Sequence, residues 1–320
     1  GLPGALPATV LARRFRTPQA RALLAGAAAH AMLPLTAPLT SAFALLLLAI
    51  AHHTGWPFAA GGSGAVTGAL TRELAALGGE LETGRWIRDL AELPPARIVI
   101  LDVAPAQLAT MAGPALPPPV RRRLARFRQG PGACKVDWAL SGPVPWQDAA
   151  CRQAGTVHVG GTLEEIAASE AEVAGGRHAR QPFCIVAQPC VADQSRAPAG
   201  RHTLWGYCHV PPGSATDMSG LIEAQIERFA PGFRDLILAR SVRTAADLER
   251  YNPGYVGGDI GGGAATLRQV LLGPARAWQP YESGLPGVYL CSAATPPGGG
   301  VHGRCGEGAA RAALARLSAR

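Results

Sequence analysis

The chain has 320 residues and a mass of 33.0 kDa, which is room for about two domains of ordinary size. Hydrophobic residues make up 48% of the sequence, and this content excludes a wholly disordered chain. Charged residues are only 16%, so we expect either a surface poor in charge or a chain that packs much of itself against something else.

The net charge of +8 does not indicate a nucleic-acid-binding protein. All basic side chains except Lys135 are arginine, and with the abundant Ala, Gly and Pro this points to GC-rich coding. The arginines gather only at 13–16 and 121–128, and aromatic residues, which would stack on bases, are 6% of the chain. We therefore expect no nucleic-acid partner.

The seven cysteines lack the spacing of a zinc site or of a small disulfide-stabilised domain. No CxxC pair is present, and the histidines show no ligand spacing beside them, so no metal site is expected. An odd number of free, mostly buried thiols is typical of a reducing compartment, which predicts a cytoplasmic location.

The N-terminal part of the sequence has helical patterns. Residues 5–31 place apolar side chains among alanines and arginines and predict a helix, and a turn broken by Pro34 and Pro38 follows. The next apolar run, 39–51, is shorter than the roughly 20 residues that a membrane span needs. It favours a buried helix or the lining of an apolar substrate tunnel over membrane contact.

Helices and strands are expected in turn after a glycine-rich loop at 55–64. A helix at 65–77 ends at two glycines, 80–90 alternates like a pair of strands, and the β-branched run 96–103 is typical of a strand buried on both faces. Shorter elements follow, and a capping box, Thr162-x-x-Glu165, opens the first of the helices among them. The expected strands are 136–140, 156–159, 182–188 and 202–210, and the expected helices are 162–173 and 219–229.

The C-terminal part holds the strongest candidate site. A strand at 287–292 leads into a loop with three consecutive glycines, 298–300, and a helix follows at 303–317. Without Cβ atoms the loop backbone can approach a ligand closely, and the helix directs its N-terminal amides toward that ligand. This arrangement suits an anionic or electron-rich group, such as a phosphate or the N1/O2 edge of a flavin. The alternative is a tight turn that binds nothing.

An earlier glycine run, 62–68, resembles a dinucleotide-binding fingerprint but has the spacing GxGxxxG instead of GxGxxG. It also follows a Trp-Pro loop and not the β-branched strand that such a motif requires. We interpret it as the start of a helix, and a phosphate cradle in a plain nucleotide-binding enzyme is the alternative.

Seven motifs, spread over essentially the whole chain, occur together in one known family. They are Gly55-Trp56-Pro57, Gly61-Gly62-Ser63, Leu101-Asp102-Val103-Ala104-Pro105, Lys135-Val136-Asp137-Trp138-Ala139-Leu140, Tyr251-Asn252-Pro253, Gly257-Gly258-Asp259-Ile260 and the stretch 289–303. In this combination the chain resembles the phytoene desaturase-like branch of the NAD(P)/FAD-dependent oxidoreductases, and within it the pyridine nucleotide-disulphide oxidoreductase domain-containing proteins.

The resemblance implies a mixed α/β (α+β) fold, in which a FAD domain of the glutathione-reductase type is interleaved with a substrate domain built on an antiparallel sheet. Residues 1–58 would form the helical part of the substrate domain, 59–113 a FAD-domain segment, 114–254 the substrate-domain sheet and 255–320 the C-terminal FAD-domain segment. The implied cofactor is FAD.

The same resemblance implies cofactor-binding residues. Ile87 would lie near the adenine by its position. The loop Gly299-Gly300-Val301, with Gly298 before it, would lie against the flavin pyrimidine ring. Gly258 and Asp259 would approach the flavin from the substrate side, and the alternative for Asp259 is a turn aspartate that caps local amides.

The chain departs from the family pattern in two places. Family members begin with a strand, a GxGxxG turn and an acidic residue that holds the ribose, and the sequence shows none of these. We therefore expect the C-terminal two-thirds of a longer protein, without the N-terminal Rossmann βαβ unit. Where wider relatives carry Gly-Asp after the last strand, this chain has Ser292-Ala293-Ala294, which leaves phosphate contacts to backbone amides.

A flavin can accept a hydride from a C–H bond without a protein acid or base, provided that the protein holds the carbon against N5 and excludes water. The expected function is therefore FAD-dependent oxidation of an apolar small-molecule substrate, and the alternative is a truncated, non-catalytic relative that serves as a binding or interaction module. His302 is the candidate for proton handling, whereas Cys291 and Cys305 are interpreted as small buried residues without a redox role. Peripheral membrane contact and a homo-oligomer stay open.

Overall fold

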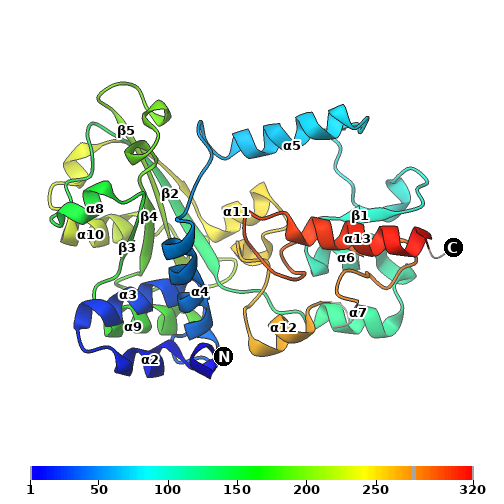
Figure 1. The fold of residues 1–320 in the computed structure, drawn as a ribbon, viewed down its shortest axis with the longest axis horizontal. Coiled ribbons are helices and arrows are strands. Elements are labelled where there is room, and N and C mark those ends of the chain that lie inside the picture. Colours follow the sequence, from blue (N-terminus) through cyan, green and yellow to red (C-terminus); the bar gives the residue numbers. More distant parts are fainter. Residues whose placement is uncertain (1, 275–278, 319–320) are drawn as a thin grey trace. The chain divides into compact units, whose positions relative to one another are not determined.

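The computed structural model describes residues 2–274 and 279–318, and it has a mixed α/β fold (Figure 1). The chain divides into two compact units built from interleaved segments. Unit 1 comprises Gly1–Arg85, Cys134–His209 and Thr216–Thr244, and unit 2 comprises Trp86–Ala133, Val210–Ala215 and Ala245–Arg320. These bounds differ from the segments expected from the sequence, since 59–85 belongs to unit 1. The assignment of segments to a FAD domain and a substrate domain stays a prediction.

A five-stranded sheet with the strand order β3-β4-β5-β2-β6 is the centre of unit 1. Its strands are β2 (Gly132–Leu140), β3 (Thr156–Val159), β4 (Cys184–Ala187), β5 (His202–Val210) and β6 (Ile237–Arg243). The pairs β3–β4, β4–β5 and β2–β6 are antiparallel. In β2 the side chains alternate as a strand requires: Val136 and Trp138 are buried, and Asp137 between them is only partly so.

The helices of unit 1 are α1 (Leu2–Ala5), α2 (Ala8–Leu11), α3 (Pro18–Ala29), α4 (Thr40–His53), α5 (Gly64–Ala76), α8 (Ala149–Gln153), α9 (Leu163–Ala174) and α10 (Ser219–Phe229). Several of them pack against the sheet or against one another, whereas α5 has no buried residue. Leu24 of α3 and Ile166 of α9 share one apolar cluster with Ile185 of β4. Trp138 of β2 packs edge-on against Phe233, and its Nε1 donates a hydrogen bond of 2.9 Å to Glu223 of α10. The elements are therefore joined by buried contacts between residues distant in sequence.

Local sequence signals explain where several helices begin. The predicted capping box of α9 is present: Thr162 Oγ1 accepts from Glu165 N, and Glu165 Oε2 accepts from Thr162 N at 2.8 Å. Thr17 caps α3 in a similar way by accepting from Ala20 N. Such caps satisfy amides that have no partner within the helix.

The apolar run 39–51 forms helix α4, but the expectation of a buried helix is wrong for most of it. Only Thr40, Ser41 and Ala44 of α4 are buried, and the Leu46 side chain is 61% exposed. The helix carries apolar residues on all sides, and one side packs against α3. Within the described residues no helix combines the length and the apolar character that crossing a membrane requires.

The sequence has a single lysine, Lys135, which lies on β2 on the same, partly buried side of the strand as Asp137. Its Nζ pairs with the Asp137 carboxylate and lies 5.7 Å from the centroid of the Trp205 ring on β5. The Trp205 ring in turn stacks on Tyr207, with the ring centroids 6.4 Å apart. One cation and two aromatic rings therefore share a patch of the sheet.

Unit 2 contains a parallel pair of strands, β1 (Val99–Leu101) and β7 (Val288–Leu290), in the register Val99–Val288 to Leu101–Leu290. Its helices are α6 (Pro105–Ala112), α7 (Pro118–Ala125), α11 (Ala245–Tyr251), α12 (Leu267–Leu272) and α13 (Arg304–Ser318). Leu101 and Leu290 join Leu108 of α6 in one apolar cluster, and Tyr289 packs with Ala309 and Ala313 of α13 in another. Each strand is thus followed in sequence by a helix that packs back on the strand pair.

Two sequence interpretations need correction. Residues 80–90 form no strand pair; the segment is irregular, Gly84 has a positive φ of 75°, and a short 3-10 turn, η2 (Leu90–Glu92), ends it. Its side chains are mostly exposed, so the alternation of apolar and polar residues does not correspond to a strand with one buried face. The edge strand β6 was missed, because its exposed arginines hide the strand pattern.

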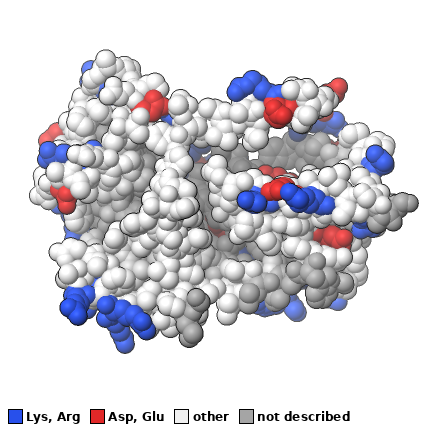
Figure 2. All heavy atoms as spheres, viewed as in Figure 1, with Lys and Arg blue, Asp and Glu red and all other residues white. Residues whose placement is uncertain are grey.

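On the face drawn in Figure 2 charged side chains are sparse, as a charged content of 16% predicts. Lys and Arg form small separate groups there and do not join into a continuous stripe.

Candidate functional site

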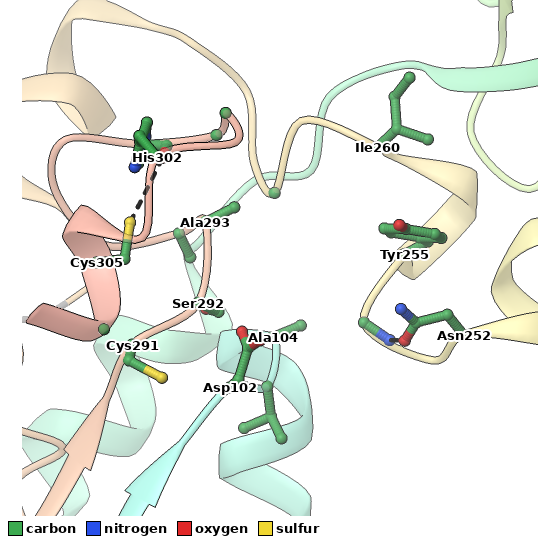
Figure 3. Close-up of a pocket in the computed structure, with 18 of the residues that line it drawn as sticks. Asp102, Ala104, Asn252, Tyr255, Ile260, Cys291, Ser292, Ala293, His302 and Cys305 are labelled. Atoms are coloured by element: carbon green, nitrogen blue, oxygen red, sulfur yellow. Dashed lines mark hydrogen bonds between the residues drawn. The ribbon is translucent and has the colours of Figure 1, made fainter. Parts of the chain in front are cut away.

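A cavity of about 490 Å³ opens where the parallel strands β1 and β7 end, and its lining residues all belong to unit 2 (Figure 3). Ligands of parallel sheets commonly bind at this edge, because the loops that follow the strands diverge there. Four segments form the wall: the residues after β1, Gln129 in the loop before β2, the segment between α11 and α12, and the residues from β7 to the start of α13. The lining includes Asp102, Ala104, Gln129, Asn252, Tyr255, Ile260, Cys291, Ser292, Ala293, Gly298, Gly299, Gly300, His302, Gly303 and Cys305.

The floor of this cavity is made by residues that directly follow the two strands. Asp102 comes after β1, and Cys291 and Ser292 come after β7. Burial raises the pKa of the Asp102 carboxyl, and burial together with the nearby Asp102 charge raises the pKa of the Cys291 thiol to about 11. The thiol is therefore protonated at neutral pH, which agrees with a residue that packs and does not react. Ser292 Oγ is buried without a hydrogen-bond partner among the described residues.

The glycine loop forms a second wall and is held in place by a backbone hydrogen bond and by the Cys305 side chain of α13. Gly298 N donates to Thr295 O at 2.9 Å, and Cys305 Sγ donates to both Thr295 O and Gly298 O at 3.4 Å. Gly298 and Gly303 have positive φ of 108° and 64°, and a Cβ built on either would meet no atom within 4 Å. These glycines therefore leave backbone facing open space, directly before the first turn of α13.

His302 lies at the same wall, but one of its nitrogens is occupied. Arg304 N donates to His302 Nδ1 at 3.0 Å, so this ring caps the start of α13. Any proton exchange with the cavity would then use Nε2. The ring is exposed, and it is the one histidine among the cavity's lining residues.

The structure brings together only part of the residues that the sequence implicated. Gly298, Gly299, Gly300 and His302 line the cavity, whereas Val301 between them is 93% exposed and does not. Ile87, Gly258 and Asp259 are also outside the lining. Their contacts with a cofactor stay predictions.

Asp259 has a clear local role. Its buried carboxylate accepts hydrogen bonds from Gly130 N at 2.6 Å and from Gly261 N at 2.7 Å. Burial raises its pKa, and the amides that it accepts from partly oppose this shift. This is the geometry of a turn aspartate that caps amides, the alternative that the sequence left open.

Several lining residues were not singled out from the sequence as site residues. Asp102 could have been found, because a polar residue that ends a buried strand lies at the edge where ligands of parallel sheets bind. Asn252 and Ile260 belong to two of the family motifs, but no role at a site was assigned to them, and Tyr255 belongs to none. All three come from a separate segment and form the wall across the opening from Ser292 (Figure 3).

The cavity can offer backbone amides at a helix start, a carboxylate, a free hydroxyl and an apolar wall. The helix amides favour negative charge, while Asp102 and Ser292 can bind hydroxyl or N–H groups. Neither a cluster of three or more metal-binding side chains nor a nucleophile with an adjacent base occurs among the described lining residues. Such a set suits a polar organic group that brings its own chemistry.

Comparison with known proteins points to one family, although no family model matches the chain. The chain is 32% identical over 148 residues to pyridine nucleotide-disulfide oxidoreductase domain-containing protein 2 of Rattus norvegicus, which covers 42% of this chain and 25% of that protein. It is 32% identical over 127 residues to 4,4'-diapolycopen-4-al dehydrogenase of Metabacillus indicus, covering 38% and 25%. An uncharacterized protein of Mycobacterium bovis is 28% identical over 318 residues, covering 83% and 56%.

Solved structures share the fold at low identity. An oxidoreductase from Methanosarcina mazei superposes with a TM-score of 0.61 at 15% identity, covering 98% of this chain and 68% of that one. A putrescine oxidase superposes with a TM-score of 0.54 at 14% identity, covering 100% and 69%.

The chain spans a quarter to about half of the length of these curated relatives. The chain is therefore similar in sequence to FAD/NAD(P)-dependent oxidoreductases over about two fifths of its length, and it shares its fold with solved oxidoreductases.

Proposed function

We propose that the cavity of unit 2 holds the flavin of an FAD-dependent oxidoreductase and that the protein oxidises a C–H bond of an apolar small molecule. The observation that carries the proposal is the glycine-lined opening at the ends of β1 and β7, in front of the first turn of α13. The sequence likeness to pyridine nucleotide-disulfide oxidoreductase domain-containing protein 2 and to a diapolycopenal dehydrogenase supports an oxidoreductase, whereas FAD itself, the substrate and the direction of the reaction belong to the proposal.

The residues present fit such a cofactor. The open positions at Gly298 and Gly303 are cradles that a Cβ would fill, so a flat ring could approach the backbone there. The hydroxyl of Ser292 is buried and lacks a partner among the described residues, which leaves it available to a bound polar group. A volume of about 490 Å³ lies within the range of small-molecule sites, roughly 300–1,000 Å³.

A bound flavin supplies the acceptor for a hydride, so the chain's own residues need only bind, orient and exclude water. The first-turn amides of α13 would stabilise negative charge that develops near them. Asp102 and Ser292 would fix the orientation through hydrogen bonds, and Tyr255 and Ile260 would exclude water from the opposite wall. His302 would pass a proton through Nε2, since its Nδ1 accepts from Arg304 N.

Flavin binding by a pair of matched glycine variants tests the proposal. Gly303 and Gly55 have nearly equal φ, 64° and 68°, and a Cβ at either position meets open space, but only Gly303 lines the cavity. Leucine at either position therefore costs about the same backbone strain, about 1–2 kcal/mol. We expect Gly303→Leu to lower the affinity for FAD at least about tenfold, because the side chain occupies the ligand's space, and Gly55→Leu to leave it unchanged.

The measurement is the visible flavin absorption that the protein retains after free FAD is removed, with thermal unfolding of both variants as the control. A wild-type chain that retains no FAD, or equal losses in the two variants, would contradict the proposed site. Retained flavin that no apolar substrate reduces would favour the alternative, a non-catalytic binding module.

A further inference from the structure

A second cavity, of about 710 Å³, lies entirely within unit 1 at one end of its sheet. It forms where β2 ends, where β5 begins and where the chain leaves β4. Its lining residues are Leu140, Pro143, Val144, Pro145, Arg152, Gln153, Gln188, Cys190, Val191, His202, Thr203 and Leu204. None of them takes part in the flavin site proposed above, so this cavity needs its own explanation.

One wall of the cavity is held by a buried amide. Gln188 Oε1 accepts from Trp146 Nε1 at 2.9 Å, and Gln188 Nε2 donates to the carbonyls of Cys151 and Ala154 at 2.8 Å each. Gln188 and Trp146 are both buried. All hydrogen-bonding atoms of this side chain are in use, and α8 is thereby fixed to the end of β4. The wall is preorganised and does not need a ligand to take shape.

Trp146, which donates to Gln188 in this wall, also holds a cationic side chain that lines the cavity. Arg152 lies on α8, and its Nε donates to Trp146 O at 2.9 Å, which fixes the plane of the guanidinium. Within the described part of the chain no carboxylate lies within ion-pair distance of Arg152. His202, at the start of β5, also lines the cavity. No acidic residue is among the lining residues, so the polar end of the cavity attracts an anion.

The rest of the lining is apolar and comes from several parts of the chain. Leu140, Val144 and Leu204 are buried, and the two prolines of the 143–145 loop stand beside them. A ligand that fills this space needs an apolar body next to its charged end. A guanidinium with a free edge matches the two oxygens of a carboxylate, with which it forms paired hydrogen bonds.

We propose that this cavity is a binding site for an amphipathic carboxylate, with the carboxylate on Arg152 and beside His202 and the apolar body against Leu140, Val144 and Leu204. The site does not depend on the flavin proposal, since its residues belong to unit 1 alone. The volume of about 710 Å³ accommodates a small organic acid and lies in the upper part of the range for ligand sites.

Calorimetric titration of the full chain with decanoate tests this assignment. We expect Arg152→Gln to weaken decanoate binding by about tenfold or more, the loss expected for a charge-assisted pair. The matched control is Arg180→Gln, which removes the same charge from an exposed arginine of unit 1 outside the cavity. Decan-1-ol, with the same chain and no charge, should bind the wild type more weakly by a similar factor.

A second variant tests the apolar part without removing a buried side chain. Val191 lines the cavity but is 42% exposed, so Val191→Trp should fill the space without disturbing the core, and decanoate binding should fall about tenfold. No measurable binding of decanoate to the wild type would overturn the proposal, as would equal affinities in the Arg152 and Arg180 variants. Equal affinities for decanoate and decan-1-ol would also overturn it.

Discussion

Three buried or partly buried histidines lie close together in unit 1 and are not needed by either proposed site. His30 Nε2 and His158 Nε2 are 2.9 Å apart, so one ring donates to the other. His209 Nδ1 lies 2.9 Å from both carboxylate oxygens of Glu170 on α9. Burial, and then the positive charges of His158 and His209, lowers the pKa of His30 to about 3, and burial lowers that of His158 to about 4. Both rings are therefore neutral in the folded chain at neutral pH.

This arrangement predicts loss of stability in mild acid. In the unfolded chain both histidines bind protons below their ordinary pKa of 6.5, whereas in the folded chain they do so only near 3 and 4. Between these values the unfolded state binds more protons, so the free energy of unfolding falls as the pH falls. Each histidine contributes on the order of 1 kcal/mol per pH unit. Denaturant unfolding at a series of pH values from 6.5 down to about 4 measures the slope.

The double variant His30→Gln/His158→Gln should show a shallower slope, because two of the groups that take up protons are gone. His53→Gln is the control, since that histidine is exposed at the end of α4 and has no such neighbours. A slope in the double variant as steep as that of the wild type would mean that other groups cause the acid sensitivity.

Among the elements, α5 differs from the other long helices because none of its residues is buried. Val66, Leu70, Leu74 and Leu77 are all exposed, with Leu70 at 67%. Helix α9 is of similar length but has a capping box and buries Ile166 and Val173. A short helix that packs its apolar side on nothing is marginal in water, because helix propensity alone scarcely offsets the cost of ordering the chain.

Hydrogen exchange should therefore distinguish these two helices. We expect amides of α5 to exchange on the order of 100-fold faster than those of α9, because they open locally without unfolding the core. Mass spectrometry of exchanged peptides provides the measurement, and α9 serves as the internal control. Equal protection in the two helices would show that α5 is covered in solution, for example by another copy of the chain.

The elements also show which parts of the fold a sequence pattern can predict. Strands β3 and β5 and helix α10 have the predicted bounds, because each has a buried side that imposes its period on the residues. Helix α7 was missed within an arginine-rich segment, where only Leu124 is buried and the apolar pattern is too short to read. The apolar periodicity of a sequence reflects which side of an element is buried, so an element with few buried side chains shows little periodicity.

At the scale of the whole molecule, the same limit applies to the candidate site. The glycine loop could be predicted, because a strand, three glycines and a helix follow one another in the sequence. The wall of Asn252, Tyr255 and Ile260 could not be predicted, since these residues are distant from that loop in the sequence and line the same cavity only in the folded chain. Arg152 and His202 likewise come together only in the folded unit 1. The assignment of the interleaved segments to functional domains stays a prediction.

The two proposed ligands should protect different parts of the chain. A ligand that binds only the folded state stabilises the segments that hold it. FAD should therefore slow hydrogen exchange in 291–306 of unit 2, and decanoate should slow it in 188–191 and 202–204 of unit 1. Each ligand measured alone is the control for the other. Protection of both sets of segments by a single ligand would contradict the presence of two separate sites.

The single lysine also offers one side chain for labelling with a fluorescent dye. An amine-directed dye can attach to one side chain only, Lys135, apart from the α-amino group. Because that amine is paired with Asp137 and lies over Trp205, a dye attached there would report on the sheet of unit 1, and the indole could quench it. A dye on Lys135 would allow the sheet to be followed by fluorescence without introducing a cysteine beside the seven that the sequence already has.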